Sequence, residues 1–153
     1  MNMDQPKIIE FWCAYGGKHP VIGDVWYRIS AARGSEASKY SRYMCDALSM
    51  IAHRASDCDT MLSLIDAVIA GKSKKEEYGL NDTCVIFEPN IAQVNILIEE
   101  KCNSPLGRFE LNKYRKVVQA WRDFLLMPEA GESKMRIELS IAPNIAPDGF
   151  AAS

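Results

Sequence analysis

Histidine is scarce in this sequence, and its scarcity limits the metal and acid–base chemistry that the chain can support. The two histidines are His19, in a glycine-rich stretch before Pro20, and His53, at the end of a helical pattern. A histidine at a helix C-terminus complements the negative carbonyl end, so we expect a structural role for His53. We expect no metal, no cofactor and no catalytic residues. One alternative stays open, namely a small enzyme that pairs His19 with a thiol such as Cys13.

Paired cysteines and a phosphate-binding loop are also missing. The five cysteines are odd in number and form no C-x-x-C pair; they are Cys13, Cys45, Cys58, Cys84 and Cys102. The Met1 end lacks a basic region followed by an apolar run and a cleavage site, so we expect free thiols in a reducing cytoplasm. Gly16 and Gly17 precede Lys18, but without the longer spacing that a phosphate loop needs.

The chain has neither an excess of positive charge nor a long apolar run. Its 18 basic and 20 acidic residues give a net charge of -2. The positive field that nonspecific phosphate binding requires is therefore absent, and we expect no direct contact with nucleic acid. Charged residues interrupt every hydrophobic segment well before the roughly 20 positions that cross a bilayer. We therefore expect no membrane span and a cytoplasmic protein.

The length and composition of the chain indicate a single domain over residues 1–153. Hydrophobic residues make up 48% and charged residues 25%, proportions typical of a globular domain with one core. The segment Lys7–Tyr15 predicts a buried strand, although so short an apolar run could also open a helix. The following segment predicts a loop and then a short helix over Val25–Ala32, with Asp24 as its cap. Residues 142–153 predict a loose tail.

Three amphipathic helices are predicted from apolar residues at helical spacing. The first begins near Ser35, whose side chain can accept from the free backbone amides. The second begins at Ser56, with Asp59 three residues later, and ends at Gly71. The third begins at Asn112. The apolar stripes are Ala37, Tyr40, Met44, Ala47, Leu48 and Ile51; Met61, Leu64, Ile65, Val68 and Ile69; and Tyr114, Val117, Val118, Trp121, Phe124 and Leu125.

A hairpin is predicted between the second and third helices. Its strands are Cys84–Glu88 and Ala92–Glu99, on either side of Pro89-Asn90. Apolar and polar residues alternate in the second strand, which predicts one buried and one wet face, with Gln93 and Asn95 on the wet face. Leu97 falls on this polar side, so it is either covered by another element or exposed where a partner docks.

Two further short strands are predicted over Arg108–Leu111 and Met135–Ile141. Together with the hairpin they can form one sheet, since hairpin-connected strands pair antiparallel. We therefore expect an α+β fold in which an antiparallel sheet of about four strands packs against three main helices.

A hairpin, a short F-x-L segment and a tryptophan-containing helix follow one another in the second half of the chain. NDTCVIFEPN precedes AQVNILIEE in the hairpin, and FELNKYRKVVQAWRDFL closes the series with Phe109, Leu111, Trp121, Phe124 and Leu125. This order resembles the bacterial immunity proteins of contact-dependent growth inhibition and related polymorphic toxin systems. The likeness covers about half of the chain. It implies a cytoplasmic inhibitor without catalytic activity, whose partner is the C-terminal domain of a cognate toxin, often a nuclease.

The resemblance also implies a binding surface suited to a basic partner. A nuclease that grips phosphates is basic, so an acidic patch on its inhibitor speeds the encounter and adds specificity. The candidate residues lie at the ends of the hairpin and are Glu76, Glu77, Asp82, Leu97, Glu99 and Glu100. A merely solvated sheet edge is the alternative interpretation of the acidic residues. An adaptor that binds another protein through exposed apolar groups such as Leu97 is the alternative function.

Overall fold

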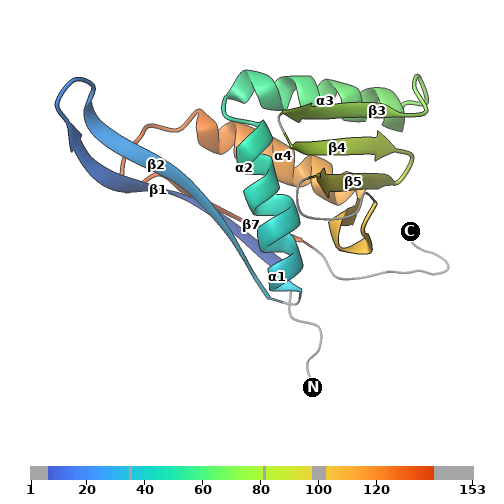
Figure 1. Ribbon diagram of the computed structural model, residues 1–153, viewed down its shortest axis with the longest axis horizontal. Coiled ribbons are helices and arrows are strands. Elements are labelled where there is room, and N and C mark those ends of the chain that lie inside the picture. The colour runs from blue at the N-terminus through green and yellow to red at the C-terminus, as the bar shows by residue number, and fades with distance from the viewer. Residues whose placement is uncertain (1–6, 35, 81, 98–102, 140–153) are drawn as a thin grey trace.

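The chain forms two antiparallel sheets, of three and four strands, with the helices packed against them (Figure 1). The computed structural model describes residues 7–34, 36–80, 82–97 and 103–139. The α+β class is confirmed, as is the packing of helices against an antiparallel four-stranded sheet. The second, three-stranded sheet was not expected. The predicted tail, residues 142–153, lies outside the described residues.

The three-stranded sheet has the order β2-β1-β7, with all neighbours antiparallel. Its strands are β1 (Lys7–His19), β2 (Gly23–Arg33) and β7 (Lys134–Leu139). The predicted strand that begins at Lys7 is confirmed and runs further than expected, and the one predicted from Met135 is confirmed as β7. Because β7 pairs with β1, the last strand of the chain belongs to this sheet and not to the sheet of the predicted hairpin.

The short helix predicted over Val25–Ala32 is wrong, because these residues lie in β2. Valine, isoleucine and aromatic side chains favour a pleated surface, and antiparallel pairing along the length of β1 outweighs the local helical pattern. Asp24 therefore caps no helix; its Oδ1 accepts a hydrogen bond from the Tyr15 hydroxyl at 3.4 Å. The distal part of this hairpin projects beyond the helices (Figure 1). We call this part, residues 15–27, the arm.

The first predicted helix is confirmed and has three consecutive pieces. These are α1 (Ala37–Tyr40), a π-helical segment (Ser41–Asp46) and α2 (Ala47–Ile51). The predicted cap Ser35 lies outside the described residues. The apolar stripe of this helix is buried apart from its edges, because the helix contacts β2 on one side and the four-stranded sheet on the other.

The second predicted helix is confirmed as α3 (Ala55–Ile69), but its predicted start is wrong. Arg54 is the N-cap, and Ser56 already lies in the first turn. Asp57 supplies the carboxylate of the capping box, and its Oδ2 accepts a hydrogen bond from the Arg54 backbone N–H at 3.0 Å. The predicted end is confirmed, since Gly71 has a φ of 78°, the left-handed conformation that closes a helix.

The four-stranded sheet has the order β3-β4-β5-β6. Its strands are β3 (Glu76–Leu80), β4 (Thr83–Glu88), β5 (Ile91–Ile96) and β6 (Arg108–Glu110). The predicted hairpin is confirmed as β4 and β5, with Asn90 in the turn at a φ of 69°. The edge strand β3 was not predicted, because EEYGL has no apolar alternation; pairing with β4 holds it in place.

The face of β5 that was predicted to be wet is buried. Gln93 and Asn95 are almost fully covered, and residues 103 and 104 contact them on this face. Gln93 Nε2 donates to the Ser104 carbonyl and Asn95 Oδ1 accepts from the Asn103 backbone N–H, both at 2.8 Å. Polar side chains can be buried when they are hydrogen-bonded. The alternation of apolar and polar residues in β5 therefore exists, but the prediction that its polar residues are exposed is wrong.

The third predicted helix is confirmed as α4 (Leu111–Leu125), which begins one residue before Asn112. Its apolar stripe is buried, including Trp121, which is a core residue as expected. The Trp121 Nε1–H donates a 2.8 Å hydrogen bond to the Ala52 carbonyl just after α2. The ring of Trp121 also meets that of Phe11 on β1, with centroids 5.0 Å apart. Trp121 therefore connects α4 both to the end of α2 and to β1.

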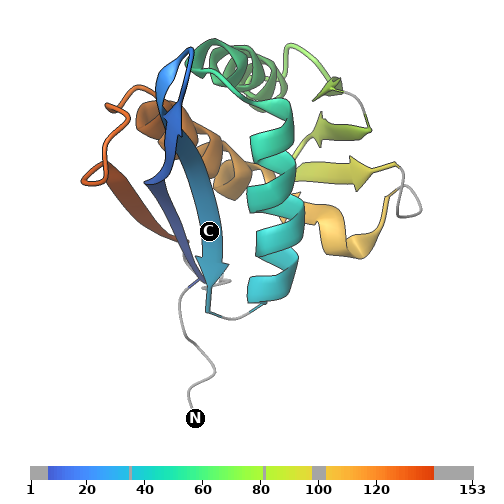
Figure 2. The same ribbon diagram turned by 60° about the vertical axis from the view of Figure 1, so that its left-hand side comes forward.

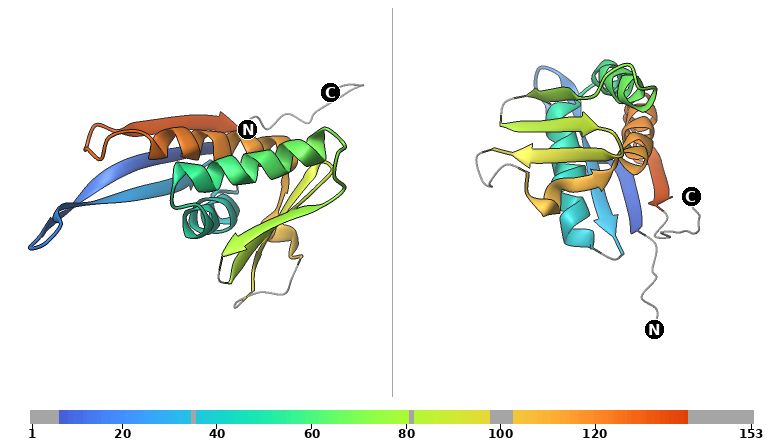
Figure 3. Two further views of the ribbon diagram at one scale, coloured as in Figure 1. Left: turned by 90° about the horizontal axis from the view of Figure 1, so that it is seen from above. Right: turned by 90° about the vertical axis from the view of Figure 1, so that its right-hand side faces the viewer.

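The helices form a layer between the two sheets (Figures 2 and 3). α4 contacts β1 and β7 on one side and β5 and β6 on the other, and α3 lies along α4 and over β3 and β4. Each sheet consequently has one face on the helices and one face directed outward. Within the described part of the chain, no helix combines the length and the apolar character needed to cross a membrane.

Candidate functional site

The structure brings together only some of the predicted site residues. Glu76 and Glu77 are consecutive in β3, so their side chains point to opposite faces of the sheet. Glu77 is exposed on the outward face, and Asp82 is exposed in the turn between β3 and β4. Glu99 and Glu100 lie outside the described residues. The acidic patch therefore reduces, in the described part, to Glu77 and Asp82.

Leu97 lies beside these two carboxylates. Its backbone N–H donates a 2.7 Å hydrogen bond to the Asp82 carbonyl, which fixes the end of β5 against the β3–β4 turn. The Leu97 side chain is 48% exposed. It lines a pocket of about 420 Å³ whose other lining residues are Glu77, Gly79, Leu80, Thr83 and Cys84. Of the two explanations for Leu97, cover by another described element is excluded by this exposure, and docking of a partner stays a prediction.

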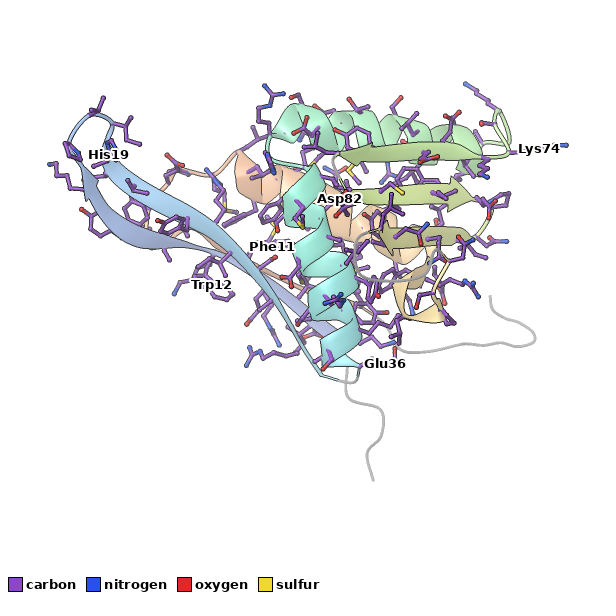
Figure 4. All side chains as sticks on the ribbon, viewed as in Figure 1. Phe11, Trp12, His19, Glu36, Lys74 and Asp82 are labelled. Atoms are coloured by element: carbon purple, nitrogen blue, oxygen red, sulfur yellow. The ribbon has the colours of Figure 1, made fainter. Side chains whose placement is uncertain are left out.

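Two further exposed apolar side chains lie at this end of the sheet, on its helix-facing side, whereas Leu97 and Glu77 are on its outward side. Leu80 ends β3 and is nearly half exposed, as is Met50 in the last turn of α2. Met50 reaches the same end of the sheet, because its Sδ accepts a hydrogen bond from Thr83 Oγ1 at 3.8 Å. Figure 4 shows Asp82 next to this end of α2. We call the surface formed by Met50, Leu80, Leu97, Glu77 and Asp82 the turn patch.

Gly79 is one of the residues that line the pocket in the turn patch. A Cβ atom at this position would lie 2.7 Å from Cys84 Cβ and 2.7 Å from the Thr83 carbonyl oxygen. Both neighbours belong to the paired strand β4, which cannot move away without breaking the pairing. Glycine is therefore required here for the close approach of two strands, and this approach leaves the space that Leu80 and Leu97 line.

The residues that motivated a thiol–histidine enzyme are not brought together. His19 lies at the tip of the arm, where its Nδ1 accepts hydrogen bonds from the backbone N–H groups of Val21 at 3.0 Å and Ile22 at 3.3 Å. Cys13 lies six positions earlier on β1, roughly 20 Å away at about 3.3 Å per residue. Its thiol is buried and donates to the Pro128 carbonyl. His19 therefore has a structural partner in the turn.

Two other thiols are held in their protonated form. Burial raises the pKa of Cys45 to about 12, and it raises that of Cys58 to about 12 as well. A thiolate is the reactive form of cysteine, so burial suppresses the reactivity of both groups. His53 is exposed after α2, and its backbone N–H donates to Asp57 Oδ2 at 3.0 Å. The residues of known placement include no group of three or more metal-ligating side chains.

The structure also contains a polar groove between α3 and α4, which the sequence did not indicate. Its volume is about 820 Å³. Two ion pairs cross it: Arg115 donates to both carboxylate oxygens of Asp66 at 2.7 and 3.0 Å, and Arg122 Nε lies 2.5 Å from Asp59 Oδ1. The hydrogen bonds from Arg115 lower the pKa of Asp66. The two ion pairs hold the two helices together, and Lys72 is a further cation in the lining of the groove.

The arm carries the most exposed apolar side chains, and sequence reasoning missed it. At its tip Val21 is 84% and Ile22 is 71% exposed. Along its length the rings of Tyr15 and Trp26 contact each other at a tilt of 59°, with centroids 5.1 Å apart. Tyr27 lies over Gly16, where a Cβ would clash with the ring. Interpreting the β2 segment as a helix concealed this hairpin. The alternation of Val25, Tyr27 and Ile29 was the available signal.

Comparisons with known proteins found no relationship. No protein-family model, no curated protein and no solved structure matches this chain.

Proposed function

We propose that this protein is an immunity protein, which binds the C-terminal domain of a cognate toxin in the cytoplasm of the producing cell and blocks its activity. The observation that carries the proposal is the turn patch, in which exposed Leu80, Leu97 and Met50 are bordered by Glu77 and Asp82. The order of elements from Ala47 to Leu125 supports it through its resemblance to such proteins. In this proposal the toxin domain is a nuclease.

The composition of the turn patch suits a protein partner with a basic surface. Protein interfaces typically have an apolar centre that is desolvated on binding and a polar border that stays wet. Exposed carboxylates at the border raise the association rate with a cationic partner, and the effect weakens as salt screens the charges. The pocket beside Leu97 has room for one apolar side chain of the partner. Among the described residues that line the pocket, Glu77 is a carboxylate and none is basic.

The experiment is to mix the protein with the product of the toxin gene adjacent to its own gene. We expect a complex that survives size exclusion chromatography at micromolar concentration, and loss of the toxin domain's nuclease activity at equal molar ratio. Raising the ionic strength should slow association more than it speeds dissociation. Absence of a complex, or a complex in which the toxin domain keeps its activity, would contradict the proposal.

A further inference from the structure

The outward face of the four-stranded sheet contains a pocket near the turn between β4 and β5, at the end opposite to the turn patch. Its volume is about 350 Å³, at the lower end of the range of small-molecule sites. We call it the sheet pocket. The described residues that line it are Lys75, Ile86, Glu88, Ile91, Gln93, Asn103 and Arg108.

A buried glutamine in the lining fixes the position of Arg108. Gln93 is 6% exposed, and its Nε2 donates to the carbonyl oxygens of Ser104 at 2.8 Å and Val94 at 3.3 Å. Its Oε1 accepts a hydrogen bond at 3.2 Å from Nε of Arg108, which lies directly opposite on β6. Since an arginine donates and a carbonyl accepts, this amide has one possible orientation. The arginine is therefore held by a rigid partner.

Gly107 makes room for this arrangement. It ends the 3-10 helix that directly precedes Arg108. A Cβ atom at Gly107 would clash with the Val94 carbonyl oxygen and would lie 3.2 Å from Gln93 Nε2. The backbone thus approaches the buried amide closely, one residue before the arginine that the amide holds.

Arg108 keeps most of its hydrogen-bonding capacity. The bond to Gln93 uses one of the five N–H donors of the guanidinium, so four remain on its two terminal nitrogens. Among the described residues, neither Arg108 nor Lys75 forms an ion pair. Both are exposed, and both line the sheet pocket. The pocket therefore has two cations that can accommodate an anion.

The charges of the described lining favour a ligand with a single negative charge. Lys75 and Arg108 outnumber Glu88 by one. Glu110, the next outward residue on β6, is paired with Lys113 at 3.7 Å. A carboxylate has one charge and matches the planar fork of an arginine. A phosphate group carries a charge of about −1.5 to −2 at pH 7, which would leave an excess of negative charge beside Glu88.

The remaining part of the lining is apolar. Ile86 on β4 and Ile91 on β5 are half-buried. Ile86 lies opposite Gln93 and Ile91 lies opposite Glu88, so both isoleucines belong to the outward rows that contain the polar groups. A hydrocarbon group that contacts them is removed from water, which favours binding.

We propose that the sheet pocket binds a carboxylate carried on a short alkyl chain. Arg108, held by Gln93, donates hydrogen bonds to the carboxylate oxygens, and Lys75 is the second cation. The alkyl chain contacts Ile86 and Ile91. The described linings of the sheet pocket and of the pocket in the turn patch share no residue, so this site does not depend on the proposed immunity function.

Titration of the isotopically labelled chain with hexanoate, followed by nuclear magnetic resonance, tests the site. The ionic strength is held constant with sodium chloride, because salt screens exposed charges. We expect saturable shifts of the Gln93 side-chain amide and of the Arg108 Nε–H, with a dissociation constant of roughly 1 mM for so small a ligand. Hexanamide, which has a similar shape and no charge, should bind at least tenfold more weakly.

Substitutions in the lining should act in opposite directions. Arg108→Gln should weaken hexanoate binding about tenfold, because it removes the charged hydrogen-bond donors. Lys75→Gln should weaken it about threefold, and Glu88→Gln should strengthen it about threefold, since a like charge is removed. Lys134→Gln is the matched control. It removes one exposed positive charge from β7, in the other sheet, and should leave the affinity unchanged.

Three results would overturn the proposal: shifts that do not saturate, equal binding of hexanamide, and weaker binding after Glu88→Gln. The last result would indicate a cationic ligand. Equal weakening by Arg108→Gln and Lys134→Gln would also overturn it, because a general attraction of anions would then explain the binding.

The carboxylate can belong to a small free acid or to a glutamate side chain of a protein partner, and competition distinguishes the two. Weaker binding of the toxin domain in the presence of hexanoate would support a glutamate of the toxin. Unchanged binding would support a small free acid. A chain that binds hexanoate but does not bind the toxin domain would contradict the immunity function and support the carboxylate site.

Discussion

The backbone N–H of Leu97 donates a 2.7 Å hydrogen bond to the carbonyl oxygen of Asp82. This bond connects the first residue after β5 with the turn that joins β3 and β4. It places an exposed leucine next to an exposed carboxylate. The apolar side chain of Leu97 and the carboxylate of Asp82 come from different connections of the sheet but lie on one surface. The proposed binding function depends on this surface.

Replacing Gly79 with alanine should destabilise the protein and deform the turn patch. The added Cβ meets β4 atoms at 2.7 Å, so β3 must move outward, at a cost of about 1–3 kcal/mol. Urea denaturation measures the change in the free energy of unfolding. Gly131→Ala is the control, because nothing lies within 4 Å of its added Cβ. Equal stability of the two variants would contradict the close approach.

Replacing Trp121 with phenylalanine should lower the free energy of unfolding by about 1–3 kcal/mol. The change removes the Nε1–H donor and leaves the Ala52 carbonyl unpaired in a buried place. Thermal unfolding followed by circular dichroism gives the comparison. Trp26→Phe serves as the control, since Trp26 is half-buried in the arm. A Trp121 variant as stable as the control would show that the bond contributes little.

The bridge between Asp66 and Arg115 should make stability depend on pH in the acidic range. Hydrogen bonds from Arg115 lower the folded pKa of Asp66 below its value in the unfolded chain. The contribution is therefore complete above about pH 4, the ordinary range of an aspartate, and is lost as the pH falls through the folded pKa. A double-mutant cycle with Asp66→Asn and Arg115→Gln should give a coupling of about 0.5 kcal/mol at pH 7, since the pair is largely exposed. Coupling that persists at pH 2 would contradict this assignment.

The thiols of Cys45 and Cys58 should resist alkylation in the folded protein. Burial raises the pKa of each to about 12, so at pH 8 the thiolate is rare and the reagent has no access. Iodoacetamide labelling followed by mass spectrometry of the peptides tests this. Both residues should react once urea unfolds the chain. Rapid labelling of either thiol in the folded state would contradict this prediction and support the alternative hypothesis of an enzyme that uses a cysteine.

Periodic patterns predicted the helices and the hairpin because each carries its signal locally. Trp121 shares a stripe with Val117 and Phe124, and such a stripe has to face the core. Strands whose conformation depends on pairing with another strand were harder to predict from their own sequence. β2 was mistaken for a helix because its partner β1 decides its conformation, and β3 has hardly any pattern of its own.

The candidate site was predicted in part, for the same reason. Asp82 and Leu97 could be named from their positions at the ends of the hairpin. Met50 and Leu80 could not, because α2 and β3 reach that place through the tertiary fold. Gln93 shows the opposite failure: its polarity suggested solvent, but the Ser104 carbonyl satisfies it in a buried place.

The most direct test of the central claim is calorimetric titration of the toxin domain into the unaltered chain and two variants. Leu97→Asp puts a charge on the apolar part of the turn patch, where Leu97 is 48% exposed. Val21→Asp makes the same kind of change at the tip of the arm, where Val21 is 84% exposed. We predict that Leu97→Asp weakens binding at least thirtyfold, about 2 kcal/mol, whereas Val21→Asp leaves it unchanged. Unchanged binding by Leu97→Asp, or a greater loss with Val21→Asp, would contradict the account.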